Sequence, residues 1–159
     1  MLIALESLVM CFILLIICVI GIANGPVGLV NFYEKDVQER VVELGLTTKK
    51  RIKRNSLICS AAMFIPIIFL VPAMVYFING ARDFWDIFWQ ISIILWIMGL
   101  FDRVFIDWYW VGHTKAWFIS GTEDLMPYIP AKTVIFKWTG TIVTYPIFAA
   151  VISAVITHF

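Results

Sequence analysis

Four long apolar stretches dominate this sequence, and each is close to the length that a helix needs to cross a lipid bilayer. A hydrocarbon core of about 30 Å requires about 20 mainly apolar residues in a helix. The sequence is 62% hydrophobic and 14% charged, which is far from the balance of a soluble domain. It therefore predicts an all-α, polytopic integral membrane protein, a four-helix bundle in which residues 1–159 form one domain. The expected transmembrane spans are residues 2–22, 57–77, 87–106 and 139–156.

The first stretch could be a cleaved signal peptide or a retained membrane helix. Signal peptides begin with basic residues and end in a cleavage site of small residues. This stretch has no basic residue before its apolar core, carries Glu6, and lacks such a cleavage site. We expect it to be retained as the first transmembrane helix.

The basic residues are concentrated in two alternating loops, residues 34–55 and 113–138, which hold ten of the twelve Lys and Arg. Short loops rich in Lys and Arg stay on the cytoplasmic side of a membrane. The sequence therefore predicts that both of these loops are cytoplasmic. Both termini and the turn at residues 79–86 are then expected on the outside.

The first of these loops contains a short amphipathic pattern followed by a basic segment. Val37, Val41 and Leu44 recur at helical spacing with charged residues between them, which predicts a helix lying at the membrane surface. Residues 49–54 read KKRIKR and lead into the second span. Basic residues beside a span attract anionic lipid headgroups. No aromatic or folded reading surface accompanies them, so no nucleic-acid partner is expected.

The third stretch carries charges inside the hydrocarbon depth. Only fifteen uncharged residues separate Asp86 from Asp102. As a helix they rise about 22 Å, which is short of the bilayer core. The helix must therefore continue to about Asp107, with Asp102 and Arg103 inside the membrane. Ionisable residues at that depth pair with one another or face a polar cavity.

Helical periodicity places most polar residues of this third helix on one face. The loop that follows is too apolar to extend into water, and we expect it to fold back and bring Glu123 or Asp124 near Arg103 and His113. The candidate binding residues are Asp102, Arg103, Asp107, Trp110, His113, Lys115, Glu123 and Asp124.

Two accounts of this cluster are open. In the first, the charges form a structural network in a bundle or at a contact with another copy of the chain or a partner subunit. In the second, they line a pocket of a small membrane enzyme or binding protein for a lipid headgroup or small polar substrate. His113 and Asp107 are then the catalytic candidates, with His113 as acid or base and Arg103 binding an anion. Four spans are few for the third possibility, a transporter or channel subunit, unless the chain oligomerises.

The sequence contains no signature of nucleotide, hydrolase or zinc chemistry. The second histidine, His158, is expected at the opposite membrane face from His113, and any hard cation at the carboxylates would compete with Arg103 and Lys115. Cys11, Cys18 and Cys59 lie in apolar stretches without paired spacing, so no disulfide framework is expected. No metal or cofactor is predicted.

Overall fold

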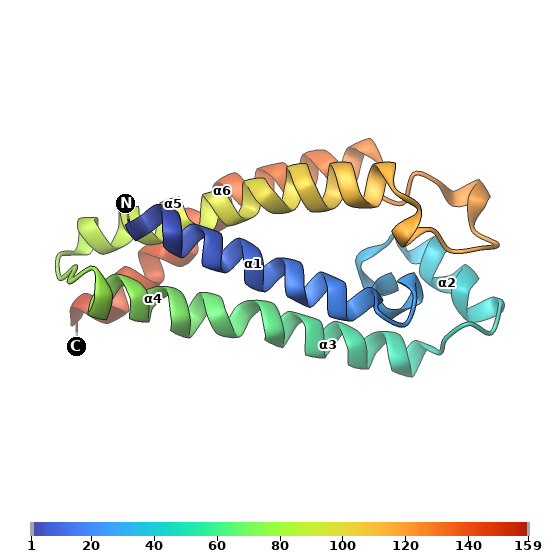
Figure 1. Ribbon diagram of the computed structural model, residues 1–159, viewed down its shortest axis with the longest axis horizontal. Helices are drawn as coiled ribbons and strands as arrows, with labels where there is room; N and C mark the ends of the chain where they lie inside the picture. Colours follow the sequence, from blue (N-terminus) through green and yellow to red (C-terminus); the bar gives the residue numbers. More distant parts are fainter. Residues whose placement is uncertain (1, 159) are drawn as a thin grey trace.

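The computed structural model describes residues 2–158, which contain helices and loops but no strand. Four long helices lie side by side and alternate in direction, so that both ends of the chain lie at one end of the bundle (Figure 1). Each is long and apolar enough to cross a membrane. They are α1 (Leu2–Ile22); α3 (Lys49–Ile65), which continues through η2 (Pro66–Leu70), α4 (Val71–Ala73) and η3 (Met74–Ile78); α5 (Phe84–Phe101), which continues as η4 (Asp102–Val111); and α6 (Ala131–His158).

Three of these helices extend beyond the predicted spans. The second begins at Lys49, because the Thr48 side chain caps it by accepting a hydrogen bond from the backbone N–H of Arg51 at 3.3 Å. The third continues past Asp102 to Val111, as its length requires. The fourth begins directly after Pro130. The basic segment KKRIKR thus forms the first turns of α3 rather than a loop.

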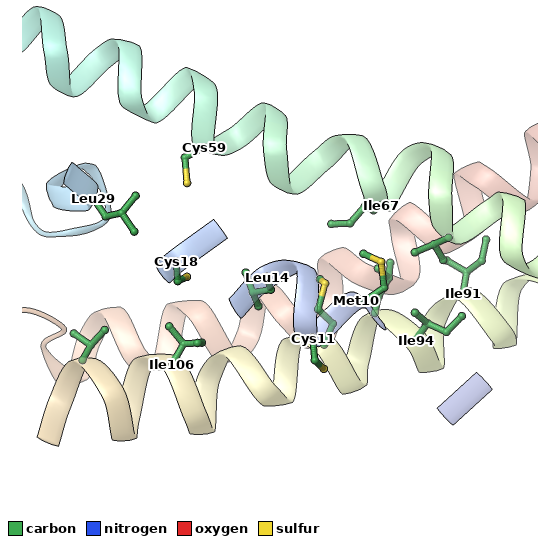
Figure 2. Packing of buried hydrophobic residues seen from close by; sticks show 14 of the residues in the cluster. Met10, Cys11, Leu14, Cys18, Leu29, Cys59, Ile67, Ile91, Ile94 and Ile106 are labelled. Atoms are coloured by element: carbon green, nitrogen blue, oxygen red, sulfur yellow. The ribbon is translucent and has the colours of Figure 1, made fainter. Parts of the chain in front are cut away.

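The core lies where α1 packs against the other long helices. Met10 and Leu14 of α1 are buried beside Ile91 and Ile94 of α5 and Ile67 of η2 (Figure 2). All three cysteines are buried free thiols in this region. They therefore act as small apolar core residues.

The outer faces of the bundle are also apolar. Leu57, Phe77 and Phe136 are 73%, 77% and 78% exposed. A helix at the surface of a soluble bundle would carry polar side chains at such positions. These outer faces match a hydrocarbon environment.

Helices α5 and α6 pack closely together at Gly99. A Cβ atom at this position would lie 2.6 Å from the Tyr145 ring and 2.7 Å from the Thr141 methyl group. The absence of a side chain at Gly99 therefore permits this close packing.

The end of the bundle away from the termini is closed by two short helices and a loop (Figure 1). After α1 the chain turns at Gly25 into η1 (Pro26–Phe32) and then α2 (Lys35–Glu43). α2 forms in the segment predicted to be an amphipathic helix, with Val37 and Val41 buried. Leu44 lies just beyond the helix and is 46% exposed, so the buried face is shorter than predicted.

Candidate functional site

The charged residues of the third helix form a network with one residue of α6. Arg103 donates hydrogen bonds to the carboxylates of both Asp102 and Asp107. Lys137 lies 3.0 Å from each carboxylate oxygen of Asp107. All four side chains are less than one quarter exposed. Two cations and two anions therefore balance in one partly buried cluster, which we call the ion network.

Lys137 is the member of the ion network that sequence reasoning missed. In the sequence it stands out only as one of the basic residues that set membrane orientation. The structure begins α6 at Ala131, so Lys137 lies nearly two turns inside the helix and not in the loop before the predicted span. There its side chain is less than one quarter exposed and pairs with Asp107, as Arg103 does.

The backbone around the ion network is π-helical over Asp102–Val111. At its end, for example, the N–H of Gly112 bonds to the carbonyl of Asp107, five residues earlier. Such segments are rare and occur frequently at functional sites. π-helical turns also occur at Pro66–Leu70 and Met74–Ile78, which carry no charged residue, so the backbone form alone does not mark the ion network.

A cavity of about 370 Å³ lies beside the ion network. Arg103, Asp107 and His113 contribute its polar groups, and most of its remaining lining is apolar or aromatic, including Trp108, Trp138 and Tyr128. Of the predicted site residues, only Arg103, Asp107 and His113 line it. Its size and mixed lining suit a small amphiphilic molecule.

The His113 imidazole is held by the helix that precedes it. Its Nδ1 lies 2.6 Å from the backbone carbonyl oxygen of Trp108, and its ring packs against the Trp108 ring at 4.7 Å. A carbonyl oxygen can only accept, so Nδ1 carries the proton and donates it. In the neutral ring Nε2 is then left as the basic nitrogen.

Glu123 and Asp124 do not form the predicted contact with Arg103 and His113. Arg40 of α2 donates to both oxygens of Asp124, at 3.1 and 3.0 Å. This contact lowers the pKa of the Asp124 carboxyl. The backbone N–H of Gly121 donates to Glu123 at 3.1 and 3.0 Å and lowers the pKa of that carboxyl. The loop folds back as expected, but its acidic residues bind α2 and the loop itself.

Trp110 and Lys115 also lie outside the cavity. The Trp110 ring makes an edge contact with Trp117, with ring centroids 5.3 Å apart. Lys115 is exposed at the start of η5 (Lys115–Trp117). These two residues belong to the loop packing and its surface, and not to the ion network.

A set of buried hydroxyl groups, which sequence reasoning did not identify, fastens the loop to η1. The Tyr33 hydroxyl donates to the carbonyl of Trp117 at 2.9 Å. The Tyr128 hydroxyl lies 2.7 Å from the Thr122 hydroxyl and accepts from the N–H of Ile119 at 3.0 Å. Burial raises the pKa of the Tyr33 hydroxyl. A single tyrosine in a loop carries no sequence signal of such a partner.

A second polar cluster lies near the other end of the bundle. Glu6 of α1 is only 5% exposed, and the Asn79 side-chain amide donates to it at 3.0 Å. The same amide donates to the Gln90 side chain of α5 at 2.8 Å. This cluster connects three segments and was also not predicted.

Comparisons with protein-family models, with curated proteins and with solved structures gave no match. Within residues 2–158 no group of three or more His, Cys, Asp or Glu side chains is placed to hold a metal ion. The ion network and the cavity beside it are therefore the features that bear on function.

Proposed function

We propose that the chain is a multi-pass integral membrane protein, with both termini outside and the loops 34–55 and 113–138 in the cytoplasm. The four long apolar helices and their apolar outer faces support insertion. The orientation is supported by the concentration of basic residues in the two loops at one end of the bundle.

Within the membrane, we propose that the protein is a structural or complex-forming component. The observation that supports this role is the charge balance of the ion network. Arg103 is paired with Asp102 and Asp107, and Asp107 is shared with Lys137. A site for an anionic ligand leaves cationic charge free to bind it, whereas this network is already neutral. It joins η4 to α6 and so contributes to the packing of the bundle.

The outer surface offers room for a protein partner. Of the four spans, α6 has the smallest buried share. Its lipid-side face is therefore available to a second copy of the chain or to another membrane subunit. The basic segment 49–54 is proposed to contact anionic lipid headgroups.

The structural role is tested by two variants of the ion network. Arg103→Leu leaves Asp102 without a cation and should destabilise the protein by about 3 to 5 kcal/mol, as does breaking a buried ion pair from one side. The double variant Asp102→Leu/Arg103→Leu removes both charges and leaves the Asp107–Lys137 pair in place. It should recover much of the lost stability in thermal unfolding of the purified protein.

The exposed Lys115 provides the control, because Lys115→Leu also removes one cation from the same end of the bundle. Its melting temperature should match that of the wild type. A fully stable Arg103→Leu variant would contradict the structural role. The combination Arg103→Leu/Asp107→Leu is less informative, since it also removes the partner of Lys137.

The second candidate function is a small membrane enzyme or binding protein for a polar headgroup or small polar substrate. The cavity favours it, because Arg103, Asp107 and His113 all line the same space. His113 would act as acid or base through Nε2, and Arg103 would contact an anionic group. Under this function, His113→Asn should fold normally and lose a molecule that co-purifies with the wild type. Identical bound molecules in both proteins would argue against it.

A further inference from the structure

A groove of about 500 Å³ lies between α1 and α3, at the end of the bundle that carries the basic loops. It shares no lining residue with the cavity beside the ion network. Arg51, Arg54 and Asn55 lie in its lining toward the start of α3, and Ile17, Ile20 and Ile58 are among its apolar walls. Figure 2 shows Cys59, another lining residue, pointing from α3 toward the space beside α1. The groove is therefore charged toward the start of α3 and apolar along its length.

The periodicity of α3 places these residues on one face. Arg51, Asn55, Ile58 and Ala62 follow one another at steps of four, three and four residues, and all line the groove. The helix rises about 16 Å from Arg51 to Ala62. This length is close to half of the roughly 30 Å hydrocarbon core. The groove thus extends from the basic segment into the apolar part of the helix, over a length comparable to one leaflet.

The walls of the groove are set by packing between η1 and the neighbouring helices. Asn55 donates a hydrogen bond to the carbonyl of Gly28 at 3.0 Å, which ties α3 to η1. A Cβ atom at Gly28 would lie 2.1 Å from the carbonyl oxygen of Gly21, so η1 contacts the backbone of α1 directly. These contacts hold η1 against both helices at the charged end of the groove.

The cations in the groove have no acidic partner in the described part of the chain. Neither Arg51 nor Arg54 forms an ion pair among residues 2–158, and α3 contains no acidic residue. By contrast, Arg40, Arg103 and Lys137 each bind a carboxylate. The guanidinium groups of Arg51 and Arg54, beside an apolar channel, therefore complement a ligand with an anionic head and an apolar tail.

We propose that this groove binds one phospholipid with an anionic headgroup. The phosphate binds Arg51 and Arg54, whose guanidinium groups match phosphate oxygens in charge and geometry. One acyl chain runs along Ile17, Ile20 and Ile58 toward the bilayer centre. This assignment rests on the membrane insertion proposed above, and it narrows the expected headgroup contact of residues 49–54 to one face of α3.

The other face of α3 supplies a matched control. Lys49 and Lys53 line a separate pocket against α2, together with Lys35 and Gln38. They belong to the same basic segment as Arg51 and Arg54 but do not line the groove. Replacing either pair by Gln removes the same charge from the same turns of one helix.

The test uses the full chain purified in a neutral detergent and measures its melting temperature against added phosphatidylglycerol, phosphatidylcholine or inorganic phosphate. We expect phosphatidylglycerol alone to raise the melting temperature of the wild type. Arg51→Gln/Arg54→Gln should weaken its apparent affinity by more than about tenfold, because the variant loses the charge-assisted hydrogen bonds of two guanidinium groups to the phosphate. Lys49→Gln/Lys53→Gln should weaken it far less. An equal loss in both variants would show diffuse surface attraction and overturn the proposal.

Two further measurements test whether the lipid occupies the groove itself. Ala62→Trp fills the apolar end of the groove without a change in charge and should abolish the stabilisation, while Leu57→Trp, outside the groove and exposed, should retain it. An equal response to inorganic phosphate would mean that the apolar walls contribute nothing and would overturn the phospholipid assignment. A chain that stays soluble after detergent removal would instead contradict membrane insertion itself.

Discussion

Tyr33 and Tyr128 stack with their ring centroids 4.6 Å apart and their planes 18° from parallel. Tyr33 follows η1, and Tyr128 lies in the loop before α6, so the contact joins two segments far apart in the sequence. Thr133 at the start of α6 donates to Glu34 beside the same contact. The two basic loops therefore pack together and close this end of the bundle as one unit.

The Tyr33 hydroxyl is expected to contribute to the stability of this unit. Tyr33→Phe keeps the stacked ring but leaves the buried carbonyl of Trp117 without its donor. An unsatisfied buried polar group costs about 1 to 3 kcal/mol. Thermal unfolding should show a loss of that size. Tyr109→Phe is the control, because Tyr109 is half exposed and its hydroxyl should be replaceable without loss.

The helices of this bundle could be predicted from the sequence because their signal is local. Apolar length alone located all four, and the rise per residue required the third helix to continue past Asp102. The pairing of Arg103 with Asp107 was also predictable, because residues four apart face each other on a helix, whereas the adjacent Asp102 lies at a spacing that predicts no contact. Lys137 lies on another helix, and no spacing rule connects it to Asp107.

The loop contacts were less predictable for a related reason. Composition showed that the loop after His113 must fold back, but not which carboxylate meets which cation. Asp124 binds Arg40 because α2 packs against this loop, an arrangement that depends on the buried Val37 and Val41 and on the tyrosine contact. Such choices follow from tertiary packing, which sequence periodicity does not record.

The ion pair of Arg40 and Asp124 should make stability depend on pH in the acidic range. Arg40 lowers the pKa of the Asp124 carboxyl in the folded protein. A lowered carboxyl pKa stabilises the fold above the unfolded value of about 3.9 and loses that contribution as pH falls through the lower folded value. The melting temperatures of wild type and Asp124→Asn should therefore differ at pH 6 and converge in stronger acid. Glu39→Gln, an exposed control on α2, should have the melting temperature of the wild type both at pH 6 and in stronger acid.

The crossing of α5 and α6 should be sensitive to one methyl group. Gly99→Ala places a Cβ within 2.7 Å of Thr141 and Tyr145, and Thr141 is β-branched and buried. Overpacking of this kind costs about 1 to 3 kcal/mol. Gly140→Ala meets no atom within 4 Å and should be neutral or slightly stabilising. Equal melting temperatures for the two variants would contradict the close approach of these helices.

The proposed orientation can be tested with a reporter enzyme that is active only outside the cytoplasm. The structure places the two basic loops at one end of the bundle and the turn near Asn79 at the other. Because Lys and Arg are retained in the cytoplasm, fusions after Phe159 or within residues 79–83 should be active. Fusions after Lys49 or after Ser120 should be silent, and a cytoplasmic reporter at the same four positions should give the opposite result. Activity after Lys49 would invert the topology and would place His113, the ion network and the groove at Arg51 on the outer face of the membrane.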